Sequence, residues 1–187
     1  MLTLSSKQQW GIGGVLMLVM LATRSHMVDH LQDASWAVFL LLGFYVRPLW
    51  AYALFWVAGF AVDYAVTSNG WISSYCLTPA YGFTFVAYAA LWAAGRWLAS
   101  QYQQDWRDLV KLAAATISGT LVCFLITNAS FYALAGYFGP MSAADYSVAV
   151  LKYLPAYLQT TLFYVGVAAL VHIAALQTTR TKNSATV

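Results

Sequence analysis

The sequence contains no glutamate, and only 8% of its 187 residues are charged. Soluble globular domains carry about 25% charged residues, so this composition excludes an ordinary water-soluble domain. The net charge of +3 is small and its cations are scattered, which argues against a protein that binds nucleic acid. The chain has only two cysteines, one in a polar segment and one in an apolar run, and this excludes a disulfide framework.

The sequence also lacks the motifs of several enzyme classes. It has no Walker motif, no glycine-rich phosphate loop, no HExxH zinc motif and no nucleophile elbow. Hydrolysis of ATP by this chain is therefore not expected. If the chain moves a solute uphill, another subunit or a trapping reaction must supply the energy.

Hydrophobic residues make up 61% of the chain and form six apolar runs. They predict an all-α integral membrane protein with six transmembrane helices in a single domain, residues 1–187. A helix needs about 20 residues to cross a bilayer, so the last four runs are long enough and the first two are short by several residues. We expect the first run to be an uncleaved helix, since one cation precedes it and further spans follow. The runs are residues 10–23, 34–46, 49–67, 79–99, 112–136 and 148–176.

Six crossings would place both ends of the chain on one side of the membrane. All nine Lys and Arg residues can then be assigned to a side. Arg24 and Lys152 fall on the side opposite the termini, and the other cations fall on the side of the termini: Lys7, Arg47, Arg96, Arg107, Lys111, Arg180 and Lys182. Because cytoplasmic loops carry an excess of cations, we expect both termini to be cytoplasmic.

Cys76 lies in the short polar stretch WISSYCLTPAYGF, residues 71–83, between two apolar runs. A thiolate suits a soft or borderline metal, and a loop outside the membrane lets a ligand approach. One thiol is too few for a structural zinc site. A metal at Cys76 would therefore arrive inside a cofactor that already supplies most of its ligands, and no separate metal is expected. The alternative is an incidental loop cysteine.

Asp63 lies inside the apolar run 49–67, about one turn from its outer end. A carboxylate within a membrane helix is costly and normally faces a polar cavity or a partner. Asp63 precedes the Cys76 loop and Tyr81 follows it, so the three residues could converge at the outer mouth of the bundle. The alternative is an interfacial aspartate that contacts water.

A second polar group consists of His26, Asp29, His30 and Asp33. Their spacing places them on one face of a helix that continues to Trp36. Two histidines four residues apart can bind a metal or haem, so a membrane redox or haem protein that uses His26 and His30 is an alternative function. The stripe could equally be a solvated helix start or the rim of an outward pocket.

The start of the last run carries Pro155, which predicts a kink deep in a helix. Polar groups cluster near this break and in the outer half of the run 112–136, and they could hydrogen-bond a large amide-rich ligand. The Asn and Ser groups could instead bond between helices. The groups are Lys152, Tyr153, Tyr157, Gln159, Asn128 and Ser130. The outer loops add aromatic residues, among them Tyr75 and Phe138, some of which are typical of the aromatic belt at a membrane interface.

The segment Cys76-Leu-Thr-Pro-Ala-Tyr81-Gly-Phe, preceded by Asp63, resembles the BtuM family along essentially the whole chain. These proteins are solitary cobalamin-binding (S) components related to energy-coupling factor transporters. The resemblance implies six helices around an outward pocket for cobalamin or cobinamide, with Cys76 as the axial cobalt ligand and Asp63 and Tyr81 beside it. It also implies that the thiolate can displace cyanide from cyanocobalamin and that the protein lies in a bacterial inner membrane.

Together with this resemblance, the polar and aromatic groups described above predict a set of ligand-binding residues: Asp63, Tyr81, Tyr75, His30, Phe138 and Lys152. One departure concerns the first run, where related S-components dock on their membrane partner through small residues four apart. Here Leu18 interrupts the row between Gly14 and Ala22. This departure favours solitary operation in the lipid bilayer over docking on an energising module. A structural membrane protein without a small ligand is a third alternative.

Overall fold

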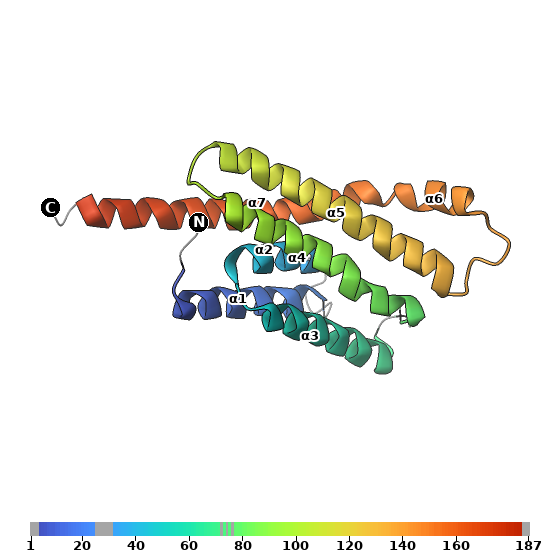
Figure 1. Cartoon of the computed structure of the whole chain (residues 1–187). Helices are drawn as coiled ribbons and strands as arrows, with labels where there is room; N and C mark the ends of the chain where they lie inside the picture. Colours follow the sequence, from blue (N-terminus) through green and yellow to red (C-terminus); the bar gives the residue numbers. More distant parts are fainter. Residues whose placement is uncertain (1–3, 25–31, 72, 74, 76, 185–187) are drawn as a thin grey trace.

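The computed structural model describes residues 4–24, 32–71, 73, 75 and 77–184. Within this described part there are helices and no strand, so the expectation of an all-α protein is confirmed. The elements, shown in Figure 1, are α1 (Ser6–Arg24), α2 (Ser35–Tyr45), α3 (Leu49–Ser68), the 3-10 helix η2 (Pro79–Phe83), α4 (Thr84–Gln101), α5 (Arg107–Leu134), α6 (Ala143–Leu151) and α7 (Leu154–Ser184).

The helices alternate in direction along the long axis of the molecule. In Figure 1, α1, α3 and α5 run from left to right, and α2, α4 and α7 run back. The start of α1 and the end of α7 therefore lie at the same end of the bundle. The opposite end is formed by the ends of α1, α3 and α5 and the starts of α2, α4 and α7.

Three of the described helices are long and apolar enough to cross a membrane, and they indicate a membrane protein. They are Leu49–Ser68, Arg107–Leu134 and Leu154–Thr178. The apolar helix α2 has only 11 residues, a length of about 16 Å, which is short of the roughly 30 Å hydrocarbon core. Large apolar side chains on the three long helices point outward, among them Leu54, Leu125 and Leu170. Lipid is the environment in which such apolar surfaces are stable.

Two of the expected spans are divided in the structure. The run 148–176 is broken after Leu151, and α7 begins again at Leu154, so Pro155 occupies the first turn of a new helix. Proline is tolerated there because the first-turn amide has no acceptor within the helix. The interruption expected near Pro155 is therefore present, but it separates two helices rather than bending one. The run 79–99 likewise begins with the separate turn η2.

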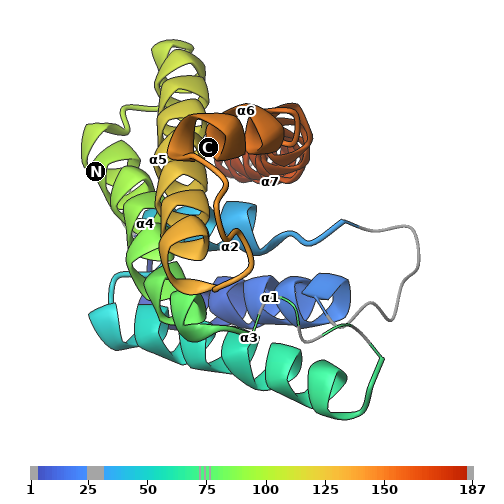
Figure 2. The same cartoon turned by 90° about the vertical axis from the view of Figure 1, so that its right-hand side faces the viewer.

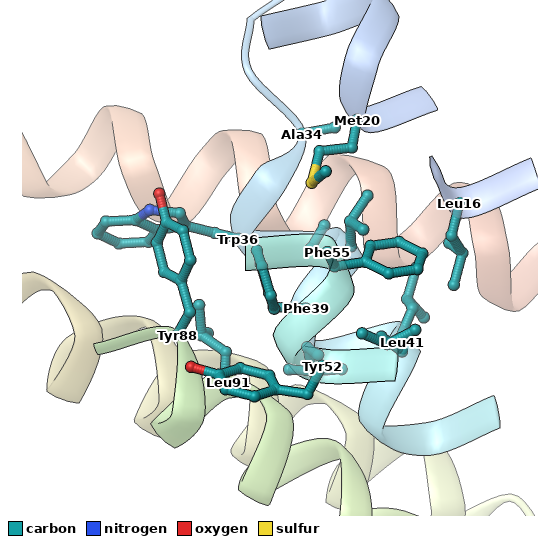
Figure 3. Close-up of a cluster of buried hydrophobic side chains, with 14 of the residues drawn as sticks. Leu16, Met20, Ala34, Trp36, Phe39, Leu41, Tyr52, Phe55, Tyr88 and Leu91 are labelled. Carbon is teal, nitrogen blue, oxygen red and sulfur yellow. The ribbon is translucent and has the colours of Figure 1, made fainter. Parts of the chain in front are cut away.

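The core is built around α2, in which all ten residues from Ser35 to Phe44 are buried. Phe39 is the centre of this core, shown in Figure 3. Its ring lies 4.5 Å from that of Tyr88 and 5.6 Å from that of Tyr52, with Phe55 at 6.4 Å. Because α2 is covered on every side, it holds the long helices in position around it, as the end view in Figure 2 shows.

Glycines permit the closest helix contact, between α2 and α4. A Cβ atom at Gly43 would collide with the backbone carbonyl of Trp92, and one at Gly95 would collide with the carbonyl of Leu40. Only residues without a side chain let the two backbones approach this closely. Gly43 and Gly95 therefore fix the point at which α2 crosses α4.

Candidate functional site

Arg24 is the last residue of α1 and forms a buried ion pair with Asp63 of α3. The Arg24 residue is 8% exposed, and the Asp63 side chain is 17% exposed. The pair is bidentate: Nε donates to Oδ1 and Nη2 donates to Oδ2, each over 2.7 Å. Paired N–H groups of a guanidinium match the two oxygens of a carboxylate, so this geometry is the strongest form of the interaction. The partner that a carboxylate in an apolar helix requires is therefore Arg24.

The remaining N–H groups of Arg24 reach four further side chains. Nη2 also donates to the Tyr81 hydroxyl over 3.2 Å, and that hydroxyl donates to Asp63 Oδ2 over 2.8 Å. Nη1 donates to Ser35 Oγ over 2.7 Å, to Asp33 Oδ2 over 3.2 Å and to the Tyr88 hydroxyl over 3.3 Å. A guanidinium has five N–H donors, so every nitrogen is engaged. One cation faces two carboxylates, and the formal charge of the cluster is −1.

This cluster lies beside a cavity of about 680 Å³, here named the Arg24 cavity. Figure 2 looks onto the end of the bundle where the cavity lies. Its volume is within the range of roughly 300–1,000 Å³ that is common for small-molecule sites. The cavity is lined by polar and aromatic residues, with a few aliphatic ones, from every long helix: Arg24, Asp33, Trp36, Asp63, Tyr75, Ala80, Tyr81, Thr84, Tyr88, Thr127, Asn128, Ser130, Phe131, Phe138, Met141, Tyr146, Ala149, Val150, Lys152, Tyr153 and Tyr157.

Five of the expected ligand-binding residues line this one cavity, namely Asp63, Tyr75, Tyr81, Phe138 and Lys152. They come from α3, the segment before η2, η2 itself, the segment before α6 and the turn between α6 and α7. The fold therefore brings together residues that are up to 89 positions apart in the chain (152 − 63 = 89). Cys76, His26, Asp29 and His30 lie outside the described residues.

Aromatic rings form much of the cavity wall. Tyr75 stacks on Tyr137 with centroids 4.5 Å apart, and Phe138 meets Tyr146 edge-on at 4.6 Å. On another side, Trp36 of α2 stacks on Tyr157 of α7 at 4.5 Å. Aromatic residues present apolar faces together with polar tips, so the wall offers both apolar contact and hydroxyl groups.

One expectation about the polar residues needs correction. Asp33 is not on a helix, because residues 32–34 before Ser35 form no regular secondary structure; its carboxylate instead accepts the Ser35 backbone N–H over 2.9 Å. Within α5, Ser130 donates to the Thr127 carbonyl over 3.0 Å and Asn128 donates to the Phe124 carbonyl over 2.8 Å, while the Asn128 amide oxygen accepts from the Tyr146 hydroxyl of α6 over 3.5 Å. Short polar side chains in helices often bond the preceding turn in this way.

The sequence-based reasoning missed Arg24, which it treated only as a cation outside the membrane. It also missed Tyr88 and Ser35. For Arg24, the sequence did contain a signal. Arg24 directly follows the first apolar run and Asp63 is the one acidic residue within a later run, so each charge needed a partner at the same membrane depth. Tyr88 and Ser35 gave no such signal, since each is an ordinary residue in an apolar segment.

Comparisons with known proteins add no assignment. No protein-family model matches the chain, and no curated protein matches it either. In the part of the chain that the structure describes, no group of three or more His, Cys, Asp or Glu residues is placed to hold a metal ion. The cavity and its lining therefore carry the functional argument.

Proposed function

We propose that the chain binds a corrinoid, cobalamin or cobinamide, in the Arg24 cavity and takes it up across a bacterial inner membrane. In this proposal six helices cross the membrane, both termini are cytoplasmic, and the protein acts without an energising module. The observation that carries the proposal is the gathering of Asp63, Tyr75, Tyr81, Phe138 and Lys152 around one cavity. Tyr75 in this lining is the residue next to Cys76 in the chain.

The chemistry of the cavity suits a corrinoid. A corrin ring is broad and apolar on its faces and bears amide side chains at its edge. The stacked rings of Tyr75, Tyr137, Trp36 and Tyr157 offer apolar contacts. The Lys152 ammonium, the phenol groups and the carboxylates of the Arg24 cluster are candidates to hydrogen-bond amides. The corrin supplies four nitrogen ligands to cobalt, so one protein thiolate is enough to complete the site.

The proposed reaction is a ligand exchange at cobalt. The Cys76 thiolate donates an electron pair to Co(III) of cyanocobalamin, and the Co–C bond breaks as cyanide leaves with its own electron pair. Cobalt keeps its oxidation state, so the step requires no reductant. The protein would thus act on its substrate while it binds it, and the cobalt–sulfur bond would retain the corrinoid.

The chain supplies a matched control for this test in its second cysteine, Cys123, which is fully buried in α5. Purified wild-type protein and the Cys76→Ala, Cys76→Ser and Cys123→Ala variants are mixed with cyanocobalamin, and the visible spectrum and the free cyanide are measured. We expect a shifted corrin band and an equivalent of cyanide from the wild type and Cys123→Ala only. The same spectral change in Cys76→Ser would refute the role of Cys76.

A binding measurement separates the cavity from the thiol. Calorimetry with cobinamide should show binding to Cys76→Ala that is weaker than to the wild type but still saturable, because the cavity wall remains. No corrinoid binding to any variant, including the wild type, would refute the proposed function. A Soret band in protein purified from cells would instead favour the haem alternative with His26 and His30. Growth on external vitamin B12 of a dependent strain that carries each variant tests uptake.

A further inference from the structure

The charged residues of the Arg24 cavity lie in two groups. Arg24, Asp33 and Asp63 form the hydrogen-bonded cluster described above, which has a formal charge of −1. Among the described residues of the lining, the other charged side chain is Lys152. It lies between α6 and α7, and Figures 1 and 2 show both helices on the side of the bundle away from α1 and α3. The cavity therefore has negative charge toward α1 and α3 and positive charge toward α6 and α7.

The Lys152 ammonium has no anionic partner. In the described part of the chain it forms no ion pair and no side-chain hydrogen bond. Its one contact is with the Tyr153 ring, whose centre lies 5.0 Å from Nζ. Such a contact between a cation and an aromatic ring is weak at an exposed site. The three N–H donors of the ammonium are therefore available to a ligand of the cavity.

The neighbouring helix ends do not account for a cation at position 152. Lys152 is the C-cap of α6, and the C-terminus of a helix favours a cation. However, α7 begins at Leu154, and the N-terminus of a helix disfavours a cation. The two helix dipoles therefore oppose each other at Lys152. In the proposed topology the residue also lies outside the cytoplasm, where loops carry fewer cations.

Cobalamin and cobinamide differ in the charge that Lys152 would meet. Cobalamin carries a phosphodiester in its nucleotide loop, with one negative charge, and cobinamide lacks the whole loop. The cobalt(III) corrin of cyanocobalamin has one positive charge, because corrin and cyanide each bring one negative charge. Cyanocobalamin is therefore neutral with separated charges. These match the two groups of the cavity, since carboxylates suit the corrin and an ammonium suits the phosphodiester.

We propose that Lys152 is a specificity-determining residue that binds the phosphodiester of cobalamin, so that the cavity prefers cobalamins to cobinamide. The inference rests on the proposed function and narrows its substrate class. Lysine binds a phosphate group as a point charge, so the site recognises the charge of the loop and not the base at its end. Cobalamins that differ only in the ligand on cobalt share this loop, and the preference holds for all of them.

Calorimetry with two corrinoids that each carry one cyanide on cobalt tests the proposal. The affinities of cyanocobalamin and aquacyanocobinamide are measured for the wild type, Lys152→Met, Lys152→Arg and Lys7→Met. Lys7 is the matched control, an exposed lysine of α1 that does not line the cavity. We expect Lys152→Met to weaken cyanocobalamin binding about tenfold, as for the loss of one charge-assisted hydrogen bond, and to leave cobinamide binding unchanged. Lys152→Arg and Lys7→Met should keep the wild-type ratio of affinities.

Salt gives a readout that a purely structural role of Lys152 would not change. Ions screen an exposed charge pair, so a rise from about 50 to about 500 mM NaCl should weaken cyanocobalamin binding more in the wild type than in Lys152→Met. An equal salt effect in the two proteins would overturn the proposal.

The two affinities also separate this inference from the proposed function. If the wild type binds both corrinoids and Lys152→Met keeps the same ratio of affinities, the role of Lys152 is overturned and the proposed function stands. An equal loss for both corrinoids in Lys152→Met would overturn it as well, since Lys152 would then shape the cavity without recognising the phosphodiester. Binding of neither corrinoid by the wild type would refute the proposed function, and this inference with it.

Discussion

The Arg24–Asp63 pair makes a specific prediction about stability. Removing one partner of a buried ion pair leaves the other uncompensated, at a cost of about 3–5 kcal/mol. We expect this full cost for Arg24→Met, because Asp63 and Asp33 would then face each other without a cation. We expect a smaller cost for Asp63→Asn, about 2 kcal/mol, because Arg24 keeps Asp33 and the amide oxygen as acceptors. In a chain of this size, 3–5 kcal/mol lowers the Tm by roughly 10 °C.

The double variant Arg24→Met/Asp63→Asn separates pairing from general damage. It removes both buried charges and leaves Asp33, whose side chain is 40% exposed, bonded to Ser35. Its cost should be about 2 kcal/mol less than the sum of the two single costs, since contacting residues couple by this order. Thermal unfolding in detergent, monitored by circular dichroism, measures the stability of the two single variants and the double variant. Arg107→Met, which removes the exposed pair with Asp105, is the control and should change little. Additive costs for the two buried residues would refute the pairing.

Three further changes give separate readouts. Gly95→Ala should lower the Tm strongly or prevent folding, because its Cβ would strike a backbone carbonyl of α2. The control Gly166→Ala meets nothing within 4 Å and should be neutral or stabilising. Equal unfolding temperatures of the two variants would contradict the close contact between α2 and α4. Thr120→Val should raise stability by about 1 kcal/mol in the same melt, since the fully buried hydroxyl has no partner among the described residues; a loss would indicate an unseen partner. Tyr81→Phe removes a 2.8 Å donor to Asp63 and should cost about 1.5 kcal/mol, together with weaker cobinamide binding by calorimetry; an unchanged melt would show that the bond contributes nothing.

The helical class and the approximate positions of the helices were predictable because apolar runs of this length have few other solutions. The residues at which the helices begin and end were less predictable. The run 112–136 begins earlier as α5, since Lys111 and Asp108 bond each other over 3.0 Å and Asp108 accepts backbone N–H groups of the preceding loop. These bonds make a polar helix start stable, and hydropathy does not register them. In the part of the chain that the structure describes, three helices are long and apolar enough to span a membrane by themselves, so the six-span topology remains a prediction.

The candidate site was predictable only where a residue type was unusual in its surroundings. Asp63 was conspicuous because a carboxylate is rare in an apolar helix. Its partner Arg24 lies 39 positions earlier, and nothing in the local sequence states that α1 ends where α3 carries its charge. The contacts of His172 were likewise not predictable, because its partners Tyr45 and Tyr102 are 127 and 70 positions away. Such pairings depend on the packing of whole helices.

The position of the Arg24 cluster has a consequence for any ligand of its cavity. In Figure 2, α1 and α3 lie together on one side of the bundle, and Arg24 is bonded to α3 through Asp63, to α2 through Ser35 and to α4 through Tyr88. A ligand group that hydrogen-bonds the Asp63 carboxylate must share it with Arg24. Binding then weakens the tie between α1 and α3, so occupancy of the cavity and the packing of α1 against α3 are thermodynamically coupled. Because the coupling is reciprocal, Asp63→Asn, which loosens the same tie, should change the corrinoid affinity even for ligands that never contact residue 63.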